Sequence, residues 1–242
     1  MSTDPLDKLT ELKDILKTVG PQNIWRPVVV NGDDLLADGI GDARDGLAEN
    51  LGNLDFQGKT VLDLGCNFGY YSFLARRAGA RRVLGIDADA RIIRGCEIIG
   101  MLNGVEGVTF RALDIIGAEG IGRFDIGLMI DLIGTQTIIT GAAKALLDSL
   151  ERLSGKEMVL TLRPRYHIGK KLGGDFQGLK EKYPGDYIRN NYFHAFQYVC
   201  NRFKAVWELS SISSQNDPQI EYKQTLHFVR RKPSPASSSK PS

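Results

Sequence analysis

The feature that most constrains the fold is a regular alternation of apolar runs and helical stretches that begins at Lys59. It predicts strands at residues 59–64, 82–87, 107–110, 124–130 and 157–163, with helices near 69–78, 89–102 and 137–152. Strands that alternate with helices of about 10 to 15 residues are typical of right-handed crossovers and a parallel sheet covered on both faces. We therefore expect an α/β protein.

Before this region, the pattern predicts an N-terminal helical cap over residues 1–57. Leucines recur at helical spacing over residues 5–18, behind the capping candidate Asp4. Val28–Val30 and the turn after it indicate a short extended segment, and a further helix is expected around residues 45–51.

The last part of the chain lacks the alternation. Residues 206–213 and 222–231 are strand-like runs with no helix between them, which predicts a terminal antiparallel hairpin. Residues 233–242 have almost nothing to bury, and we expect a disordered tail there. The main domain should span residues 58–232. Within it, the long region at residues 164–198 exceeds a simple crossover and is typical of a lid.

The composition excludes several classes of protein. The chain has 242 residues, and its net charge of +2 comes from 31 basic and 29 acidic side chains, so no large basic footprint demands nucleic acid or an anionic membrane. No apolar run approaches the roughly 20 residues of a membrane span, and the N-terminus lacks the features of a signal peptide. We expect a soluble, cytoplasmic protein. Three cysteines at wide spacings argue against a disulfide framework and a metal site.

The first strand of the alternation runs into a glycine turn, VLDLGCNFGYYS. Gly65 and Gly69 allow the backbone to turn tightly beside a ligand, and Asp63 near the strand end can accept hydrogen bonds from a cationic or polar group. The dinucleotide pattern GxGxxG fails here, because Asn67 and Tyr70 stand at its second and third glycine positions. This disfavours an NAD or FAD site, and the absence of GKS or GKT removes a P-loop NTPase.

Two further acids follow the next two strands. Asp87 ends the second strand in VLGID, where a carboxylate can bind both ribose hydroxyls. Asp114 follows the third strand in FRALDI, where it could accept a hydrogen bond from an adenine amine while Ile115 packs on the ring. Singly, each aspartate is more often a cap or turn residue. Together, at successive strand ends, they indicate a nucleoside site.

These motifs resemble those of the class I S-adenosylmethionine-dependent methyltransferases. VLDLGCNFG matches their glycine motif, GID the ribose acid, LDI the adenine-edge motif and FDIGLMIDLI the fourth-strand motif, and the resemblance runs from about Gly58 to Arg231. It implies a Rossmann-like three-layer sandwich around a mostly parallel seven-stranded sheet of order 3-2-1-4-5-7-6, with the last strand antiparallel. It also implies S-adenosylmethionine as cofactor and S-adenosylhomocysteine as product.

The resemblance assigns roles to individual residues. The methionine part of the cofactor would contact a set around the turn, namely Asp63, Gly65, Cys66, Asn67 and Gly69. Asp87 would bind the ribose, and Asp114 with Ile115 the adenine. Asp131 falls where the family's chain touches both the methionine end and the substrate. Tyr70 and Ala88, beside these positions, complete the expected cofactor set.

A looser resemblance runs from Trp25-Arg26 through GCNFGYYSF to the branch that contains the tRNA wobble-uridine carboxymethyltransferase.

Catalytic candidates should lie at the same sheet edge. His167 and Tyr166 directly follow the fifth strand, and His167 is the best candidate for a base or substrate-orienting group, with Asp131 as a third candidate. A solvent-exposed loop histidine is the alternative interpretation. Residues 192–196 are expected to form an aromatic group on a helix.

Three functions remain open. The first is a methyltransferase acting on a small metabolite or natural-product intermediate, which the near-neutral charge favours. The second is methylation of RNA, especially tRNA, favoured by the basic residues of the lid: Arg163, Arg165, Lys170, Lys171, Lys180 and Lys182. The third is a non-catalytic protein that binds S-adenosylmethionine. The helix at residues 5–18 could close the pocket or pair with a second copy in a homodimer.

Overall fold

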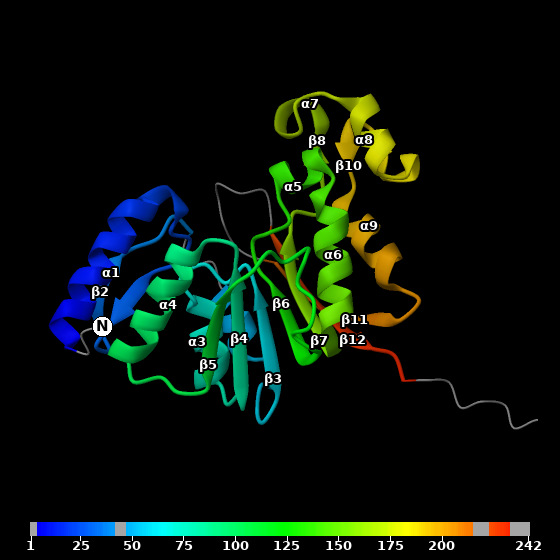
Figure 1. The fold of residues 1–242 in the computed structure, drawn as a ribbon. Coiled ribbons are helices and arrows are strands. Elements are labelled where there is room, and N and C mark those ends of the chain that lie inside the picture. Colours follow the sequence, from blue (N-terminus) through cyan, green and yellow to red (C-terminus); the bar gives the residue numbers. More distant parts are fainter. Residues whose placement is uncertain (1–3, 42–46, 215–222, 233–242) are drawn as a thin grey trace, which may run out of the picture.

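The fold is built on one seven-stranded sheet. A computed structural model describes residues 4–41, 47–214 and 223–232 (Figure 1). The sheet has the order β11-β12-β7-β6-β3-β4-β5. Its strands are β3 (Thr60–Leu64), β4 (Arg82–Asp87), β5 (Val108–Ala112), β6 (Phe124–Met129), β7 (Ser154–Leu162), β11 (Trp207–Ser214) and β12 (Gln224–Arg230). The α/β class and the mostly parallel sheet are confirmed.

The strand directions follow the expected scheme. Strands β3 to β7 pair in parallel, whereas β12 is antiparallel to both of its neighbours, β7 and β11. Numbered along the chain, these seven strands stand in the order 6-7-5-4-1-2-3, which is the expected order seen from the other edge.

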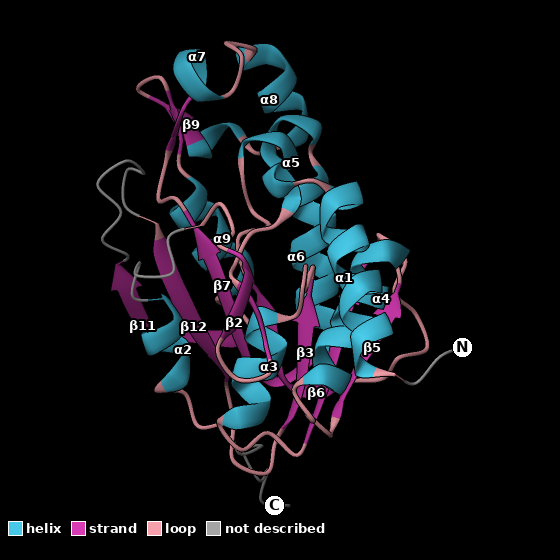
Figure 2. Ribbon diagram, turned by 90° about the vertical axis from the view of Figure 1, so that its left-hand side faces the viewer, coloured by secondary structure: helices cyan, strands magenta, loops and turns pink. Residues whose placement is uncertain are grey.

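Helices cover both faces of the sheet (Figure 2). Along β3, Val61 packs in a buried cluster with α2 (Leu47–Gly52) and α3 (Tyr70–Arg77), whereas Leu62 and Leu64 pack in another with α6 (Ala142–Leu153). Successive strand residues point to opposite faces, so a strand buried on both sides reads as a continuous apolar run.

The helix predicted at residues 137–152 is instead two helices. α5 (Thr135–Thr140) ends at Gly141, which adopts a left-handed φ of 84°, and α6 begins directly after it. Glycine takes this conformation without steric cost and commonly terminates helices.

The N-terminal part forms a layer outside α4 (Ala90–Leu102). α1 (Pro5–Val19) is capped by Asp4, whose side chain accepts a hydrogen bond from the Leu6 backbone, and it packs along α4 (Figure 1). A short 3₁₀ turn and a two-stranded hairpin of β1 (Val28–Val30) and β2 (Asp34–Ala37) follow. The helix expected around residues 45–51 is α2, and its first two expected positions lie outside the described residues, as does the tail 233–242.

The long region after β7 carries structure of its own. It contains a small sheet of order β8-β10-β9 and short helices. Its elements are β8 (Tyr166–His167), α7 (Ile168–Lys171), α8 (Phe176–Lys182), a 3₁₀ turn (Gly185–Tyr187), β9 (Ile188–Arg189), β10 (Tyr192–Phe193) and α9 (Ala195–Phe203). The aromatic helix predicted at residues 192–196 is therefore wrong in its first part, which pairs as a strand in this small sheet.

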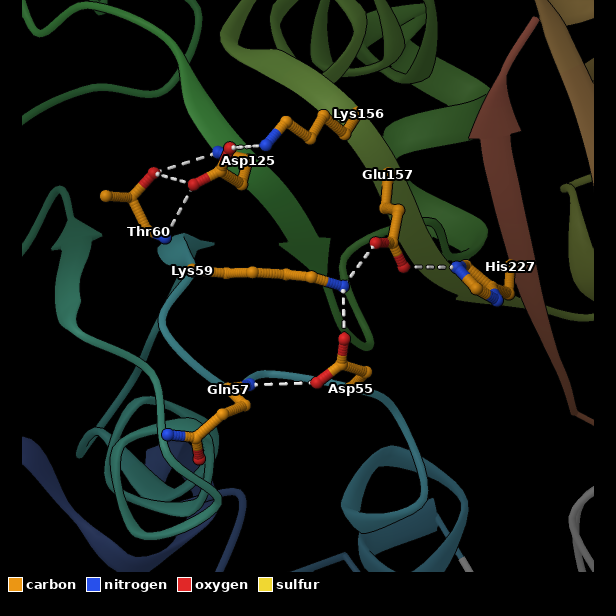
Figure 3. Close-up of polar contacts among 8 residues, drawn as sticks. All are labelled: Asp55, Gln57, Lys59, Thr60, Asp125, Lys156, Glu157 and His227. Atoms are coloured by element: carbon orange, nitrogen blue, oxygen red, sulfur yellow. Dashed lines mark hydrogen bonds and ion pairs between the residues drawn. The ribbon is translucent and has the colours of Figure 1, made fainter.

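Polar side chains tie the strands together where they begin (Figure 3). Glu157 of β7 accepts from Lys59 at 2.7 Å and lies 2.9 Å from Nε2 of His227 on β12. Asp125 of β6 accepts from the Thr60 backbone at 2.9 Å and pairs with Lys156, whose hydrogen bond contributes most to lowering the pKa of Asp125 to about 2. These contacts lie at the amino ends of the parallel strands and brace the sheet.

None of the helices in the described ranges is both long and apolar enough to cross a membrane.

Candidate cofactor-binding site

A cavity of about 160 Å³ lies at the carboxyl end of β3, where the glycine turn begins. In doubly wound sheets this is where ligands bind. The cavity is lined by Trp25, Arg26, Asp63, Gly65, Cys66, Asn67, Phe68, Tyr70, Tyr71, Asp87, Ile130, Asp131 and Leu132. Three of these residues are aspartates and one is an arginine, so the ionised lining carries an excess of negative charge.

Asp63 is the most deeply buried of the three acids. Its side chain is only 2% exposed, and Ser72 of α3 donates a hydrogen bond of 2.6 Å to Oδ2. Burial raises the pKa of the Asp63 carboxyl to about 6; the Ser72 hydrogen bond opposes this rise, and the negative charge of Asp87 adds to it. A cation beside this buried carboxyl group would stabilise its ionised form.

The glycine turn brings backbone against the cavity. Gly65 has a φ of 72°, and a Cβ there would lie 2.7 Å from Leu132 Cδ1, another residue of the lining. Gly69 also has a positive φ, and a Cβ there would lie 3.0 Å from Phe110 and Phe73. Both the conformation and the close packing therefore require glycine.

Asp87 lies at the end of β4 and faces the same cavity. Its two oxygens accept hydrogen bonds of 3.1 Å from the backbone N–H groups of Asn67 and Asp89. These bonds fix the carboxylate in place, and a carboxylate has further acceptor positions.

Asn67 binds the N-terminal part of the chain. Its Nδ2 donates 2.8 Å to the Asn23 carbonyl, and its Oδ1 accepts 3.1 Å from the Trp25 backbone. Its backbone is left-handed, with a φ of 46°, which asparagine tolerates better than most residues. The side-chain amide that was expected beside the methionine moiety is therefore occupied by residues 23–25.

Asp131 joins three parts of the chain. Its carboxylate pairs with Arg26 at 3.3 Å and with Lys223 at 2.7 Å, and Thr161 Oγ1 donates to it at 3.0 Å. It follows β6 with a φ of 59° and is 9% exposed. The partners of this carboxylate thus come from the N-terminal segment, the neighbouring strand β7 and the position just before β12.

Four residues of the expected cofactor set lie outside the lining: Gly69, Ala88, Asp114 and Ile115. Asp114 is exposed, and its Oδ1 accepts from the Ile116 backbone, which is a turn contact. Ile115 is buried in the core cluster that contains α6. Their roles at the adenine stay predictions.

The two catalytic candidates on β8 also lie outside the lining. Tyr166 is buried, donates 3.0 Å to the Ile133 carbonyl and accepts from the Arg163 backbone, and burial raises its pKa to about 12. His167 Nδ1 accepts 3.2 Å from the Lys170 backbone and caps α7. Both side chains thus have structural partners, and the role of His167 as a base stays a prediction.

The structure brings in residues that the sequence prediction left out of the site. Trp25 and Arg26 come from the N-terminal segment, Ser72 from the first turn of α3, and Lys223 from the position just before β12. One sequence feature pointed to Trp25 and Arg26, namely the looser resemblance that begins at these two residues. Ser72 and Lys223 had none, because only the folded chain brings them to Asp63 and Asp131.

Comparison with known proteins identifies the domain. Residues 55–170 match the family model described as a methyltransferase domain. Ribosomal protein L11 methyltransferases from Vibrio cholerae and Aeromonas salmonicida are 43% and 44% identical over 58 and 57 residues, which is 24% of this chain and 20% of each relative. The chain therefore matches about a fifth of the length of these curated relatives.

Solved structures share the fold. Magnesium protoporphyrin IX methyltransferase from Synechocystis PCC 6803, crystallised with bound SAH, is 20% identical, with a TM-score of 0.56 over 77% of this chain and 81% of that one. N-methyltransferase NodS from Bradyrhizobium japonicum WM9 is 13% identical, with a TM-score of 0.55 over 78% and 95%. Residues 55–170 thus match a methyltransferase domain, and the chain shares the fold of solved methyltransferases.

Proposed function

We propose that the chain is an S-adenosylmethionine-dependent methyltransferase that acts on a small metabolite or natural-product intermediate. The observation that carries this proposal is the acidic cavity beside the glycine turn, with Asp63, Asp87 and Asp131 on its lining. S-adenosylmethionine carries a sulfonium and an ammonium group against one carboxylate, so its net positive charge fits a lining that is net negative. Burial raises the pKa of the Asp63 carboxyl, so the ammonium group of this cofactor would stabilise the ionised form of Asp63 if bound beside it.

Different residues of the site would bind different parts of the cofactor. Asp63 with the turn residues Gly65 and Cys66 would hold the methionine part, and Asp87 the ribose. When bound, the cofactor supplies a methyl group already activated by the positive sulfur. The chain's own task is then to hold the acceptor in line with the methyl carbon and to exclude water. Tyr70, Tyr71 and Trp25 give the cavity the aromatic walls for this.

The proposal of a small-molecule substrate rests on the net charge of the chain and on a solved structure that shares its fold. The chain is close to neutral overall, and magnesium protoporphyrin IX methyltransferase, which shares its fold, is named for a small-molecule substrate. A homodimer through the N-terminal region stays a prediction, which sedimentation velocity would test.

RNA methylation is the second candidate, and one observation favours it. Within the part of the chain that the structure describes, none of the six lid cations named above makes an ion pair with an acid. Cations without acidic partners suit phosphodiesters. If tRNA is the substrate, its binding constant should fall steeply with salt; binding that is weak and insensitive to salt favours the small molecule.

Calorimetry with S-adenosylhomocysteine tests the cofactor directly. We expect saturable binding with one site per chain and a melting temperature that rises with ligand concentration, because the ligand binds only the folded state. NADH serves as the control nucleotide. Binding of NADH without binding of S-adenosylhomocysteine would overturn the proposal.

A further inference from the structure

A short N-terminal segment forms one wall of the cavity. We call Asn23–Arg26 the strap. Its last two residues line the cavity, and Trp25 is 43% exposed whereas Arg26 is 6% exposed, so the strap separates the cavity from solvent. The strap precedes residue 55, where the match to the methyltransferase domain begins.

Side chains of the cavity hold the strap at both ends. At one end, the Asn67 amide makes the two hydrogen bonds to Asn23 and Trp25. At the other, the Arg26 guanidinium pairs with Asp131 and lies 5.5 Å from the centre of the Tyr71 ring. Residues of the domain that should surround the cofactor are thus the residues that fix the strap.

The strap is also hydrogen-bonded to the segment around Ile40 and Gly41. Ile40 and Gly41 donate backbone hydrogen bonds of 2.8 and 2.9 Å to the carbonyls of Ile24 and Trp25. A Cβ on Gly41 would lie 2.7 Å from the Trp25 carbonyl oxygen, so the two segments pack without a gap. The strap is a braced element rather than a loose loop.

The small volume of the cavity is consistent with a strap that is closed over it. Pockets for drug-sized ligands usually have about 300 to 1,000 Å³, which exceeds the 160 Å³ found here. Widening the cavity requires a wall to move, and the sheet edge and α3 are part of the core. Within the strap, Ile24 is buried in the cluster with α1 and α4, so the part of this wall that can move is Trp25 with Arg26.

We propose that Asn67 and Asp131 are positioning residues that hold the strap over the cofactor and thereby set how slowly the cofactor leaves. This inference rests on the proposed function and specifies how exchange at that site is controlled. It also explains the asparagine in the glycine turn, since glycine there would leave the strap unheld at one end.

The variant Asn67→Gly isolates the contact. Glycine accepts the φ of 46° freely, so the turn keeps its backbone while both amide hydrogen bonds are lost. Arg26→Met removes the other end but keeps an apolar stem. Glu11→Gln is the matched control, because it weakens the Glu11–Arg94 ion pair that ties α1 to α4 without touching the strap.

Two measurements follow the strap. The chain has two tryptophans, and Trp207 is 1% exposed, so acrylamide should quench chiefly Trp25. Without ligand, we expect Asn67→Gly and Arg26→Met to raise this quenching above the wild-type level. By stopped flow, we expect both to release S-adenosylhomocysteine roughly tenfold faster, which corresponds to about 1.4 kcal/mol. Glu11→Gln should match the wild type in both.

The possible outcomes distinguish a failure of the strap proposal from a failure of the proposed function. If wild type and Asn67→Gly release the ligand at the same rate and show equal Trp25 quenching, the strap proposal is overturned. If Asn67→Gly raises the quenching but the wild type binds no S-adenosylhomocysteine, the asparagine does hold the strap, yet the proposed function and the control of cofactor exchange both fail.

Discussion

Ser72 donates a hydrogen bond of 2.6 Å to Asp63 in a place where the Asp63 side chain is 2% exposed. This is the main polar contact that the fold offers a carboxylate at the centre of the proposed site. This hydrogen bond lowers the pKa of Asp63 by less than burial raises it, so the pKa stays raised, at about 6. The fold therefore keeps an acid that it would be more stable without.

Asp63→Asn should separate stability from binding. The pKa of Asp63 is higher in the folded chain than its unfolded value of 3.8, so the folded state holds the proton more tightly and stability falls as pH rises from about 4 to about 6. Above that range the cost is about 2 to 3 kcal/mol. We expect the variant to unfold at higher urea than the wild type at pH 8, with little difference at pH 4, and to lose S-adenosylhomocysteine binding. A variant less stable than the wild type at pH 8 would contradict this.

Cofactor affinity should depend on pH through the same group. An ionised Asp63 attracts an ammonium group and a protonated one does not, so affinity should fall about tenfold for each pH unit below about 6. Calorimetric titrations of S-adenosylhomocysteine from pH 5 to pH 8 measure this. A constant affinity over that range would show that Asp63 does not contact the ligand.

Gly65→Ala should weaken the site, and Gly58→Ala provides its control. The two glycines have similar φ values, 72° and 70°, but a Cβ at position 65 would meet Leu132 at 2.7 Å, whereas at position 58 it meets nothing within 4 Å. We expect both variants to lose about 1 kcal/mol from backbone strain. Only Gly65→Ala should also lose ligand affinity, because Leu132 lines the cavity. Equal affinity in the two variants would argue against crowding at the turn.

Two variants of His167 distinguish a helix-capping role of this residue from a role as a catalytic base. His167→Ala removes the acceptor for the Lys170 backbone N–H and should cost about 1 kcal/mol, whereas His167→Asn supplies another acceptor and should keep most of that stability. Urea unfolding checks this expectation. Once an acceptor substrate is known, loss of turnover in both variants would support the base, and loss in the alanine variant alone would mark a structural effect.

The central fold could be predicted because its signals are local. The strand at residues 82–87 and the helix at residues 89–102 were predicted to within one residue, since a buried parallel strand is a continuous apolar run and Asp89 caps the helix. The first two acids, Asp63 and Asp87, could be placed at the site because the carboxyl ends of parallel strands meet at one edge.

What the sequence did not show depends on long-range contacts or on a single residue. Asn67 could be recognised as a departure from the dinucleotide pattern, but its partners lie more than 40 residues earlier in the chain. The β8-β10 pairing was missed because two-residue strands have no measurable periodicity. One residue, Gly141, divided a helix that its apolar pattern predicts as continuous.

The most direct test of the account is a crystal structure with bound S-adenosylhomocysteine. We predict the ligand in the cavity at the carboxyl end of β3, with its amino group on Asp63, its ribose hydroxyls on Asp87 and the strap closed over it. Ligand density elsewhere, or at this place without contact to either carboxylate, would contradict the account.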